Sequence, residues 1–370
     1  MIRELHSRKS VPLPLLITGL PGVPGFNAWH YFREKYPGQV IGIRQADNEK
    51  IQGPDVVPCN AEDGAGLARL FERYRFRAVL DCAGNCALKQ CEVAPEIAWR
   101  INVEGLRNLL SQTVPRGLRL VHLSCDLVFS GEKKGDRHLL PRPTFGRCPP
   151  AGCCAQKVPD TFFFGETGGY VEDDPTDPVT VYGKTMVAGE ELLLAADPAA
   201  AILRISLPMG VSANGHAGAI DWIASRFKKN RPATMYIDEV RTPTYTDCMN
   251  LLYETMLGNG LNGIFHAGGP RRMTLYQIAQ VINRVGGYNP DCLHGVPRAE
   301  AAPIPPRAGN VSMNSDKLIN ALGYDPFDAW PYCDSLMPDH EQWHRERPPD
   351  FEHSPRQLHR ILCRNPLKQG

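Results

Sequence analysis

The group of residues best suited to chemistry is a glycine-rich stretch near the N-terminus, TGLPGVPG, at residues 18–25. Gly19, Gly22 and Gly25 stand three residues apart, after an apolar run and before a segment with helical spacing. Glycines let the backbone turn tightly and approach a pyrophosphate, which then rests on the helix N-terminus. The stretch therefore predicts a dinucleotide-binding loop that also includes Val23; a purely structural turn is the alternative.

The end of the second predicted strand bears on the choice of cofactor. It reads GIRQADN, with Arg44 and no acid until Asp47. An acid at this place holds the ribose 2′-hydroxyl of NAD, whereas an arginine suits the 2′-phosphate of NADP. The sequence favours NADP(H) over NAD(H), although Arg44 could also be a solvated residue at the rim of the sheet.

The elements that must position this loop alternate along the chain. Short apolar runs predict strands at 12–18, 39–44, 55–59, 77–84, 118–129, 200–207 and 263–269. Helical spacing predicts helices at 26–36, 65–74, 94–112, 182–194, 220–229 and 274–287. Alternating strands and helices imply an α/β fold with a doubly wound parallel sheet, the Rossmann fold.

Changes in composition divide the chain into regions. We expect a dinucleotide-binding Rossmann domain over 12–206, then a smaller, mainly substrate-binding region over 207–327 with strands returning to the sheet. Residues 131–168 are rich in Pro, Gly, Cys and charge, and predict an insertion loop that is either a surface insertion or a lid. Residues 328–370 predict an irregular tail, whose Trp and Arg could anchor a partner, or a disordered end.

Bulk composition narrows the class of protein. Of 370 residues, 42% are hydrophobic and 22% charged, so a sizeable core is expected. The net charge of +1 gives no drive toward nucleic acid or an anionic membrane, and no run reaches the ~18 apolar residues of a membrane span. We expect a cytoplasmic protein.

The twelve cysteines include no repeated C-x-x-C pair, so we expect no metal site, although Cys148, Cys153 and Cys154 cluster in the insertion.

Further motifs add to the glycine-rich loop. They are CAGNCALKQC (82–91), INVEGLRNLL (101–110), LSCDLVFSG (123–131), VYGKTMVAGE (181–190), EVRTPTYTDC (239–248) and PPRAGNVSMNSDKL (305–318). With them the chain resembles the extended short-chain dehydrogenase/reductase family, above all its dTDP-4-dehydrorhamnose reductase group. That group also includes a non-catalytic relative, the regulatory beta subunit of methionine adenosyltransferase. The resemblance covers about residues 12–325, apart from the insertion.

The resemblance implies a carbonyl reduction in which Tyr182 donates a proton as hydride arrives. The family places a lysine four residues after this tyrosine and a Ser or Thr on the substrate oxygen, but here Met186 and Cys125 occupy those positions. Met carries no charge and Cys is a weak donor, so support for the tyrosinate is lost. Lys184, two residues on, points to nearly the opposite helix face.

Other site residues also follow from the resemblance. Residues expected to line the cofactor are Asn60, Cys82, Ala83 and Gly84, and Asn102 is expected to join the catalytic group. Residues expected to face the substrate are Asp126, Arg241, Thr244 and Arg307. His266 stands in an apolar strand and is expected to be a core histidine.

The resemblance therefore implies a reductase of dTDP-rhamnose biosynthesis type, which reduces the 4-keto group of a nucleotide-linked deoxysugar. The alternative is a catalytically impaired nucleotide-binding regulator or scaffold, since Met186 and Cys125 replace reactive groups. An epimerase or dehydratase ranks lower because transient oxidation depends still more on the missing lysine. A homodimer or a regulatory protein partner stays open.

Overall fold

The central element is a parallel β-sheet, seen in a computed structural model that describes residues 10–132 and 168–369. Its strands are β1 (Leu15–Ile17), β2 (Val40–Arg44), β3 (Val56–Pro58), β4 (Ala78–Asp81), β5 (Arg119–Cys125), β6 (Ala201–Ile205) and β11 (Gly263–Ala267). They lie in the order β11-β6-β5-β4-β1-β2-β3 and every neighbouring pair is parallel. The order reverses direction at β1 and β4, which confirms the predicted doubly wound α/β fold.

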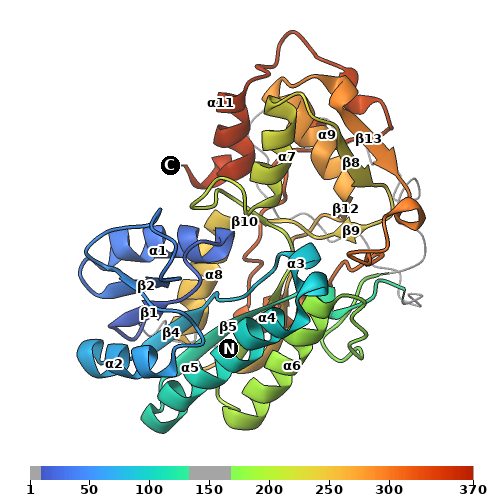
Figure 1. Ribbon diagram of the computed structural model, residues 1–370. Helices are drawn as coiled ribbons and strands as arrows, with labels where there is room; N and C mark the ends of the chain where they lie inside the picture. The colour runs from blue at the N-terminus through green and yellow to red at the C-terminus, as the bar shows by residue number, and fades with distance from the viewer. Residues whose placement is uncertain (1–9, 133–167, 370) are drawn as a thin grey trace, which may run out of the picture.

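Helices cover both faces of this sheet (Figure 1). On one face lie α1 (Val23–Lys35) and α8 (Thr246–Gly258). On the other face lie α2 (Gly64–Tyr74), α5 (Gly105–Thr113) and α6 (Val181–Ala196). Because side chains alternate along a strand, Leu15 and Ile17 of β1 join the core under α1 and α8, while Leu16 joins the other core.

The predicted helix over 94–112 is divided in the structure. After α3 (Leu88–Val93), the chain forms α4 (Pro95–Trp99), a π-helical turn (Arg100–Glu104) and then α5. A π-turn inserts one residue into a helix and commonly occurs at functional sites. This turn carries Asn102, whose side chain faces β4 and α6.

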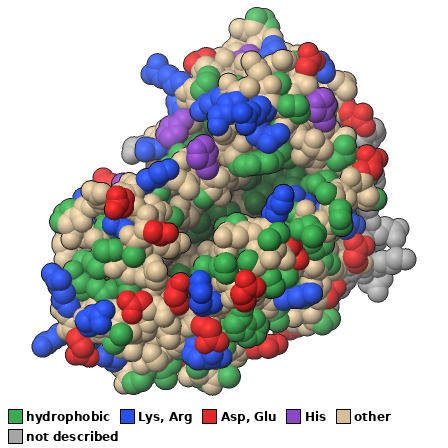
Figure 2. All heavy atoms as spheres, viewed as in Figure 1, with side chains coloured by type: hydrophobic (Ala, Val, Ile, Leu, Met, Phe, Trp, Pro, Cys, Tyr) green, Lys and Arg blue, Asp and Glu red, His purple; other side chains and the backbone are tan. Residues whose placement is uncertain are grey.

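A smaller lobe stands at the carboxyl ends of the sheet strands (Figure 1). Its helices are α7 (Ala219–Lys228) and α9 (Leu275–Gly286). Its short strand pairs are β8 (Ala233–Tyr236) with β13 (Leu293–Val296), β9 (Val240–Arg241) with β12 (Met273–Thr274), and β7 (Pro208–Met209) with β10 (Thr244–Tyr245). Figure 2 shows a hollow between this lobe and the sheet, partly lined by hydrophobic side chains. We call it the cleft.

The chain after residue 327 belongs to the folded core, not to a disordered end. The preceding region ends with α10 (Asp316–Leu322). The segment after residue 327 holds few regular elements, among them the short helix α11 (Pro355–Leu358). Trp330 is fully buried and its indole donates to the Leu362 carbonyl at 2.9 Å, while Trp343 is also buried. The expectation that tryptophans here anchor a partner is therefore wrong, because both fill the protein's own core.

Part of the predicted insertion, residues 133–167 with Cys148, Cys153 and Cys154, lies outside the described residues. Within the described ranges all nine cysteines are free thiols, and no three His, Cys, Asp or Glu side chains are grouped to hold a metal ion. Nor does any helix in those ranges have the length and apolar character needed to cross a membrane.

Candidate functional site

The glycine-rich loop joins β1 to α1 at the mouth of the cleft. Gly19 has φ +67°, and a Cβ there would stand 2.1 Å from the Cys82 carbonyl oxygen. A Cβ on Gly25 would stand 2.3 Å from the Gly19 oxygen. Gly22 caps α1, which has no acidic residue in its first turn, and Val23 opens the helix. The helix N-terminus is therefore not neutralised by a local acid, and the loop fits a pyrophosphate group.

The opposite wall of the loop is the chain after β4. The Thr18 hydroxyl donates to Asp81 and accepts the amides of Cys82 at 2.9 Å and Ala83 at 3.0 Å. Gly84 follows and is exposed. These residues lie at the carboxyl ends of β1 and β4, the neighbouring strands at which the strand order reverses. Open α/β sheets bind ligands at this place.

Arg44 braces its own loop. Its Nε donates to the Ile51 carbonyl at 2.8 Å, and Nη1 donates to the carbonyls of Gln45 at 2.8 Å and Ala46 at 3.1 Å. Asn60 supports the same loop by accepting the Ala46 amide at 2.8 Å. Two nitrogens of the Arg44 guanidinium, Nε and Nη1, already donate to three backbone carbonyls. That Arg44 binds the 2′-phosphate of NADP therefore stays a prediction.

Tyr182 is held at the first turn of α6. The Thr180 side chain caps the helix by accepting the Gly183 amide at 3.0 Å. A Cβ on Gly183 would stand 2.2 Å from the Leu127 oxygen, so only glycine lets α6 approach the turn after β5 this closely. This contact brings the Tyr182 side chain to Cys125, at the end of β5.

The Tyr182 ring packs against the buried cluster that contains Cys125, and each of the two groups influences the pKa of the other. Burial, reinforced by Asp126, raises the pKa of the Cys125 thiol to about 12. Burial, followed by the neighbouring Cys125 and Cys86, raises the pKa of Tyr182 well above its usual value. The tyrosine is therefore a neutral phenol that can donate a proton, and none of these neighbours is a cation.

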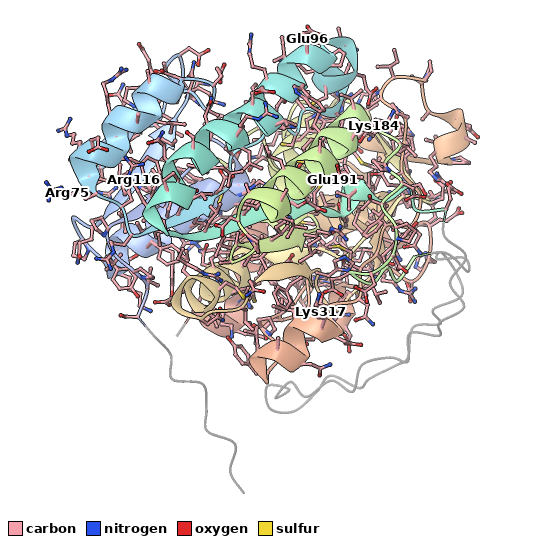
Figure 3. The ribbon with its side chains drawn as sticks, turned by 90° about the horizontal axis from the view of Figure 1, so that it is seen from below. Arg75, Glu96, Arg116, Lys184, Glu191 and Lys317 are labelled. Atoms are coloured by element: carbon pink, nitrogen blue, oxygen red, sulfur yellow. The ribbon has the colours of Figure 1, made fainter. Side chains whose placement is uncertain are left out.

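Met186 lies one turn further along α6, on the same face. It is buried in the hydrophobic cluster that also contains Cys125, Val128 and Phe129, and it supplies no charge. Lys184 is exposed, as Figure 3 shows on the outer side of α6, and cannot replace the missing cation.

Asn102 ties two parts of the site together from the π-turn. Its Oδ1 accepts the Asn85 amide at 2.6 Å, and its Nδ2 donates to the Thr185 hydroxyl at 2.8 Å. The Thr185 hydroxyl in turn donates to the Tyr182 carbonyl at 2.8 Å. Asn102 thus fixes the chain after β4 against the helix that carries Tyr182.

The predicted substrate residues Asp126 and Arg241 bind each other. Arg241 donates through Nε at 2.7 Å and through Nη2 to the two carboxylate oxygens of Asp126, which is fully buried. Ser206 also donates to Asp126, and Glu239 lies 3.5 Å from Arg241 Nη1. Burial raises the pKa of Glu239, while Arg241 and Arg307 oppose the rise. The pair joins β5 to the smaller lobe beside Cys125.

The remaining predicted residues differ in their access to the cleft. Thr244 is fully buried in β10, and its hydroxyl has no hydrogen-bond partner within the part of the chain that the structure describes. Arg307 keeps 24% of its side chain exposed, lies 3.8 Å from Glu239 and covers the Tyr236 ring at 4.6 Å. Arg307 is therefore better placed than Thr244 to meet a ligand. His266 is fully buried, as expected, and its Nδ1 lies 3.0 Å from the Tyr170 carbonyl.

Sequence reasoning missed three residues of the site. Thr18 and Asp81 order the cofactor loop, and Cys86 lies beside Tyr182. The signal for Asp81 was an acid inside an otherwise apolar strand, VLDC. A charged residue at such a place requires buried partners.

Comparison with known proteins identifies the family of this chain. The family model described as the RmlD substrate binding domain matches residues 37–152 and 155–332. The chain belongs to this family. The resemblance predicted from the motifs is thereby confirmed.

Individual relatives span most of the chain. Methionine adenosyltransferase 2 subunit beta of Rattus norvegicus is 25% identical over 312 residues, covering 82% of this chain and 81% of the relative. The structure of a dTDP-4-dehydrorhamnose reductase from Bacillus anthracis in complex with NADP has a TM-score of 0.63 and 18% identity, covering 85% of this chain and 95% of that one. A UDP-glucose 4-epimerase from Thermus thermophilus in complex with NAD has a TM-score of 0.65 and 20% identity, covering 85% and 94%. These two structures show the fold that this chain shares with them.

Proposed function

We propose that this protein binds a nicotinamide dinucleotide, NADP(H) in preference to NAD(H), in the cleft and reduces the 4-keto group of a nucleotide-linked deoxysugar. The observation that carries the proposal is the contact between Tyr182 and Cys125 at the carboxyl end of β5. It places a neutral phenol beside a thiol at the carboxyl end of β5, which neighbours β4, one of the two strands of the switch point. The bound cofactor supplies a hydride to the carbonyl carbon.

The chain's own residues would share the remaining work. The loop of Gly19, Gly22 and Gly25 holds the pyrophosphate, because side chains at the first and third positions would fill the turn. Tyr182 donates its proton to the carbonyl oxygen. Asn102 orients α6 relative to the chain after β4. Arg307, whose side chain keeps 24% of its surface exposed, is the residue we assign to the ligand phosphate.

Turnover should be slow, because proton donation leaves a tyrosinate whose influential neighbours among the described residues, Cys125, Cys86 and Asp126, include no cation. Acid–base assistance in enzymes is worth about 10²–10⁴-fold. Met186 in place of lysine, with Cys125 in place of a stronger donor, removes much of that support. The protein would then be a reductase with low activity.

A second candidate is a nucleotide-binding regulator, and Met186 is the observation that favours it. The rat relative is named as a subunit of methionine adenosyltransferase, so the corresponding proposal is a complex with that enzyme's catalytic subunit. In that case the cleft would bind its dinucleotide without consuming it.

The two candidates separate in one assay. Purified protein is incubated with NADPH, with and without dTDP-4-dehydrorhamnose, and NADPH loss is followed together with binding by nicotinamide fluorescence. A reductase shows sugar-dependent NADPH loss that disappears in Tyr182→Phe. Binding without sugar-dependent loss contradicts the reductase, and co-elution with the adenosyltransferase catalytic subunit would then support the regulator.

A further inference from the structure

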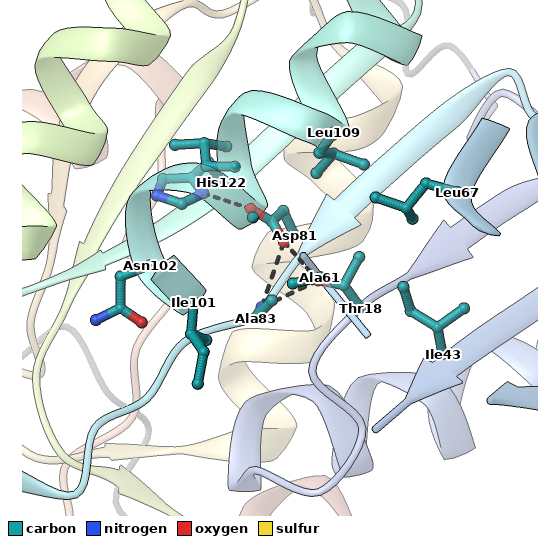
Figure 4. Close-up of a pocket in the computed structure, with 12 residues that line it drawn as sticks. Thr18, Ile43, Ala61, Leu67, Asp81, Ala83, Ile101, Asn102, Leu109 and His122 are labelled. Atoms are coloured by element: carbon teal, nitrogen blue, oxygen red, sulfur yellow. Dashed lines mark hydrogen bonds and ion pairs between the residues drawn. The ribbon is translucent and has the colours of Figure 1, made fainter. Parts of the chain in front are cut away.

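A buried pair of ionisable side chains lies beneath the cofactor loop. Asp81 ends β4 and His122 lies directly opposite it in β5, since the two are register partners. Each residue is 3% exposed, and His122 Nδ1 stands 2.7 Å from Asp81 Oδ2 (Figure 4). Neither residue belongs to the proton-donating group around Tyr182.

Asp81 connects this pair to the loop. Its Oδ1 accepts the Thr18 hydroxyl and the Ala83 amide at 3.3 Å. The Thr18 oxygen in turn accepts the amides of Cys82 and Ala83. The Cys82 carbonyl is the atom that a side chain on Gly19 would strike. A change in the orientation of Asp81 is therefore passed to both walls of the loop.

The His122 imidazole also lines a small cavity. His122 Nε2 is buried and has no hydrogen-bond partner among residues 10–132 and 168–369. His122 lines a cavity of about 20 Å³ together with Asn102, Leu106 and Leu109. About 10–15 Å³ is enough for one water molecule. When Nδ1–H donates to the carboxylate, Nε2 can accept a hydrogen bond from a donor in the cavity.

We infer that His122 is a positioning residue for cofactor binding, which acts through Asp81 and Thr18 and accepts a hydrogen bond from a water in the cavity. The inference rests on the proposed dinucleotide site. The reason lies in the hydrogen bonds that the buried Asp81 carboxylate must accept. A buried Asp must have its acceptors filled, and His122 is the donor that fills Oδ2 and leaves Oδ1 to the loop.

Two substitutions separate hydrogen bonding from ring volume. His122→Gln keeps a donor for Asp81 and an acceptor for the cavity, whereas His122→Phe keeps bulk and loses both. We expect His122→Phe to raise the Kd for NADPH about tenfold, which corresponds to 1.4 kcal/mol. His122→Gln should stay within about threefold of wild type, a difference below that value. His266→Phe, at another buried histidine, is the matched control and should leave the Kd unchanged.

Hydrogen–deuterium exchange of the cofactor-free protein gives a second readout. Amides of residues 18–25 and 82–86 should exchange faster in His122→Phe, but not in His122→Gln or His266→Phe. Wild-type exchange in both segments and an unchanged Kd in His122→Phe would overturn the inference. So would equal loosening in His122→Gln, since that result would show a need for the imidazole ring itself.

Two further results are also decisive. If His122→Phe does not fold, Asp81→Asn is measured in its place, because the asparagine side chain cannot accept hydrogen bonds from both Thr18 and His122. Unchanged exchange of residues 18–25 and 82–86 in Asp81→Asn would overturn the inference. Should wild type not bind NADPH, the proposed function fails, while exchange in the cofactor-free protein still decides the role of His122.

Discussion

Cys125 and Tyr182 show how single residues set the reactivity of this site. Both have raised pKa values, chiefly because they are buried, so both stay protonated near neutral pH. A thiol is a weaker donor than a hydroxyl, so Cys125 holds a substrate oxygen poorly. The site can therefore give up a proton but does little to stabilise the charge that develops.

Replacing the thiol tests this point. We expect Cys125→Thr to raise the sugar-dependent rate of NADPH oxidation about tenfold, since one added neutral hydrogen bond contributes roughly 0.5–1.5 kcal/mol. The measurement is the steady-state rate beside Cys125→Ala, which adds no donor. Equal rates for the Thr and Ala variants would argue that residue 125 does not hold the substrate oxygen.

The buried His266 should make the unfolding free energy of the protein depend on pH. Burial, followed by the charge of Arg204, lowers its pKa from 6.5 to about 3. The unfolded state gains a proton first, so stability is full above about pH 6.5 and is lost as the pH falls toward 3. We expect this residue to account for a fall of up to about 4 kcal/mol in unfolding free energy across that window.

The check is urea unfolding at pH 7, 5 and 4 for wild type and His266→Gln. Glutamine can still donate to the Tyr170 carbonyl but does not titrate. The wild-type free energy should therefore fall more steeply with acid than that of the variant. Parallel pH curves would show that His266 titrates alike in both states.

At the scale of elements, alternation of apolar runs and helical segments was enough to predict the seven sheet strands and most of the helices on them, but not α8, which covers one face of the sheet. The π-turn at Arg100–Glu104 was missed because its residues continue the helical spacing on either side. The two-residue strands of the smaller lobe were missed because such a length shows no periodicity. Of the site, the motif residues were predictable, whereas the Asp126–Arg241 pair and the Asp81–His122 pair depend on strands that meet only in the fold.

The β1–α1 turn supports a prediction at this scale. A Cβ on Gly22 would meet the Gly19 oxygen at 3.5 Å, an ordinary contact, whereas one on Gly19 would clash with backbone. We expect Gly22→Ala to keep wild-type stability but to raise the Kd for NADPH at least about tenfold, because the methyl group occupies the pyrophosphate's approach.

Thermal unfolding and nicotinamide fluorescence measure the two properties of this variant. Gly19→Ala is the comparison and should lose both stability and binding. Tight NADPH binding by a stable Gly22→Ala protein would place the cofactor elsewhere.

At the scale of the whole molecule, buried polar contacts and the C-terminal segment unite two lobes. Asp126 and Arg241 join the end of β5 to β9. Tyr245 of β10 donates to the Ile361 carbonyl at 2.6 Å, which ties the last residues to the smaller lobe. The cleft is thus framed by segments far apart in sequence, which no local pattern could reveal.

Breaking the central pair should destabilise the protein. We expect Arg241→Met to lower the unfolding free energy by about 3–5 kcal/mol, because Asp126 would stay buried without its cation. Arg307→Met is the control and should cost less than about 1 kcal/mol, since its side chain is partly exposed and 3.8 Å from Glu239. Equal losses in urea unfolding would show that the Asp126–Arg241 pair has no special role in joining the lobes.

A missing cation beside Tyr182 is what limits turnover at this site, and Met186→Lys would restore one. The rate of dTDP-4-dehydrorhamnose-dependent NADPH oxidation is measured for wild type, Met186→Lys and Met186→Leu, each shown to be folded and to bind NADPH. Restored support for the tyrosinate should raise the rate of the Lys variant by about 10²-fold or more, with no gain in the Leu variant. A folded Met186→Lys protein that binds NADPH and turns over no faster than wild type would contradict the account.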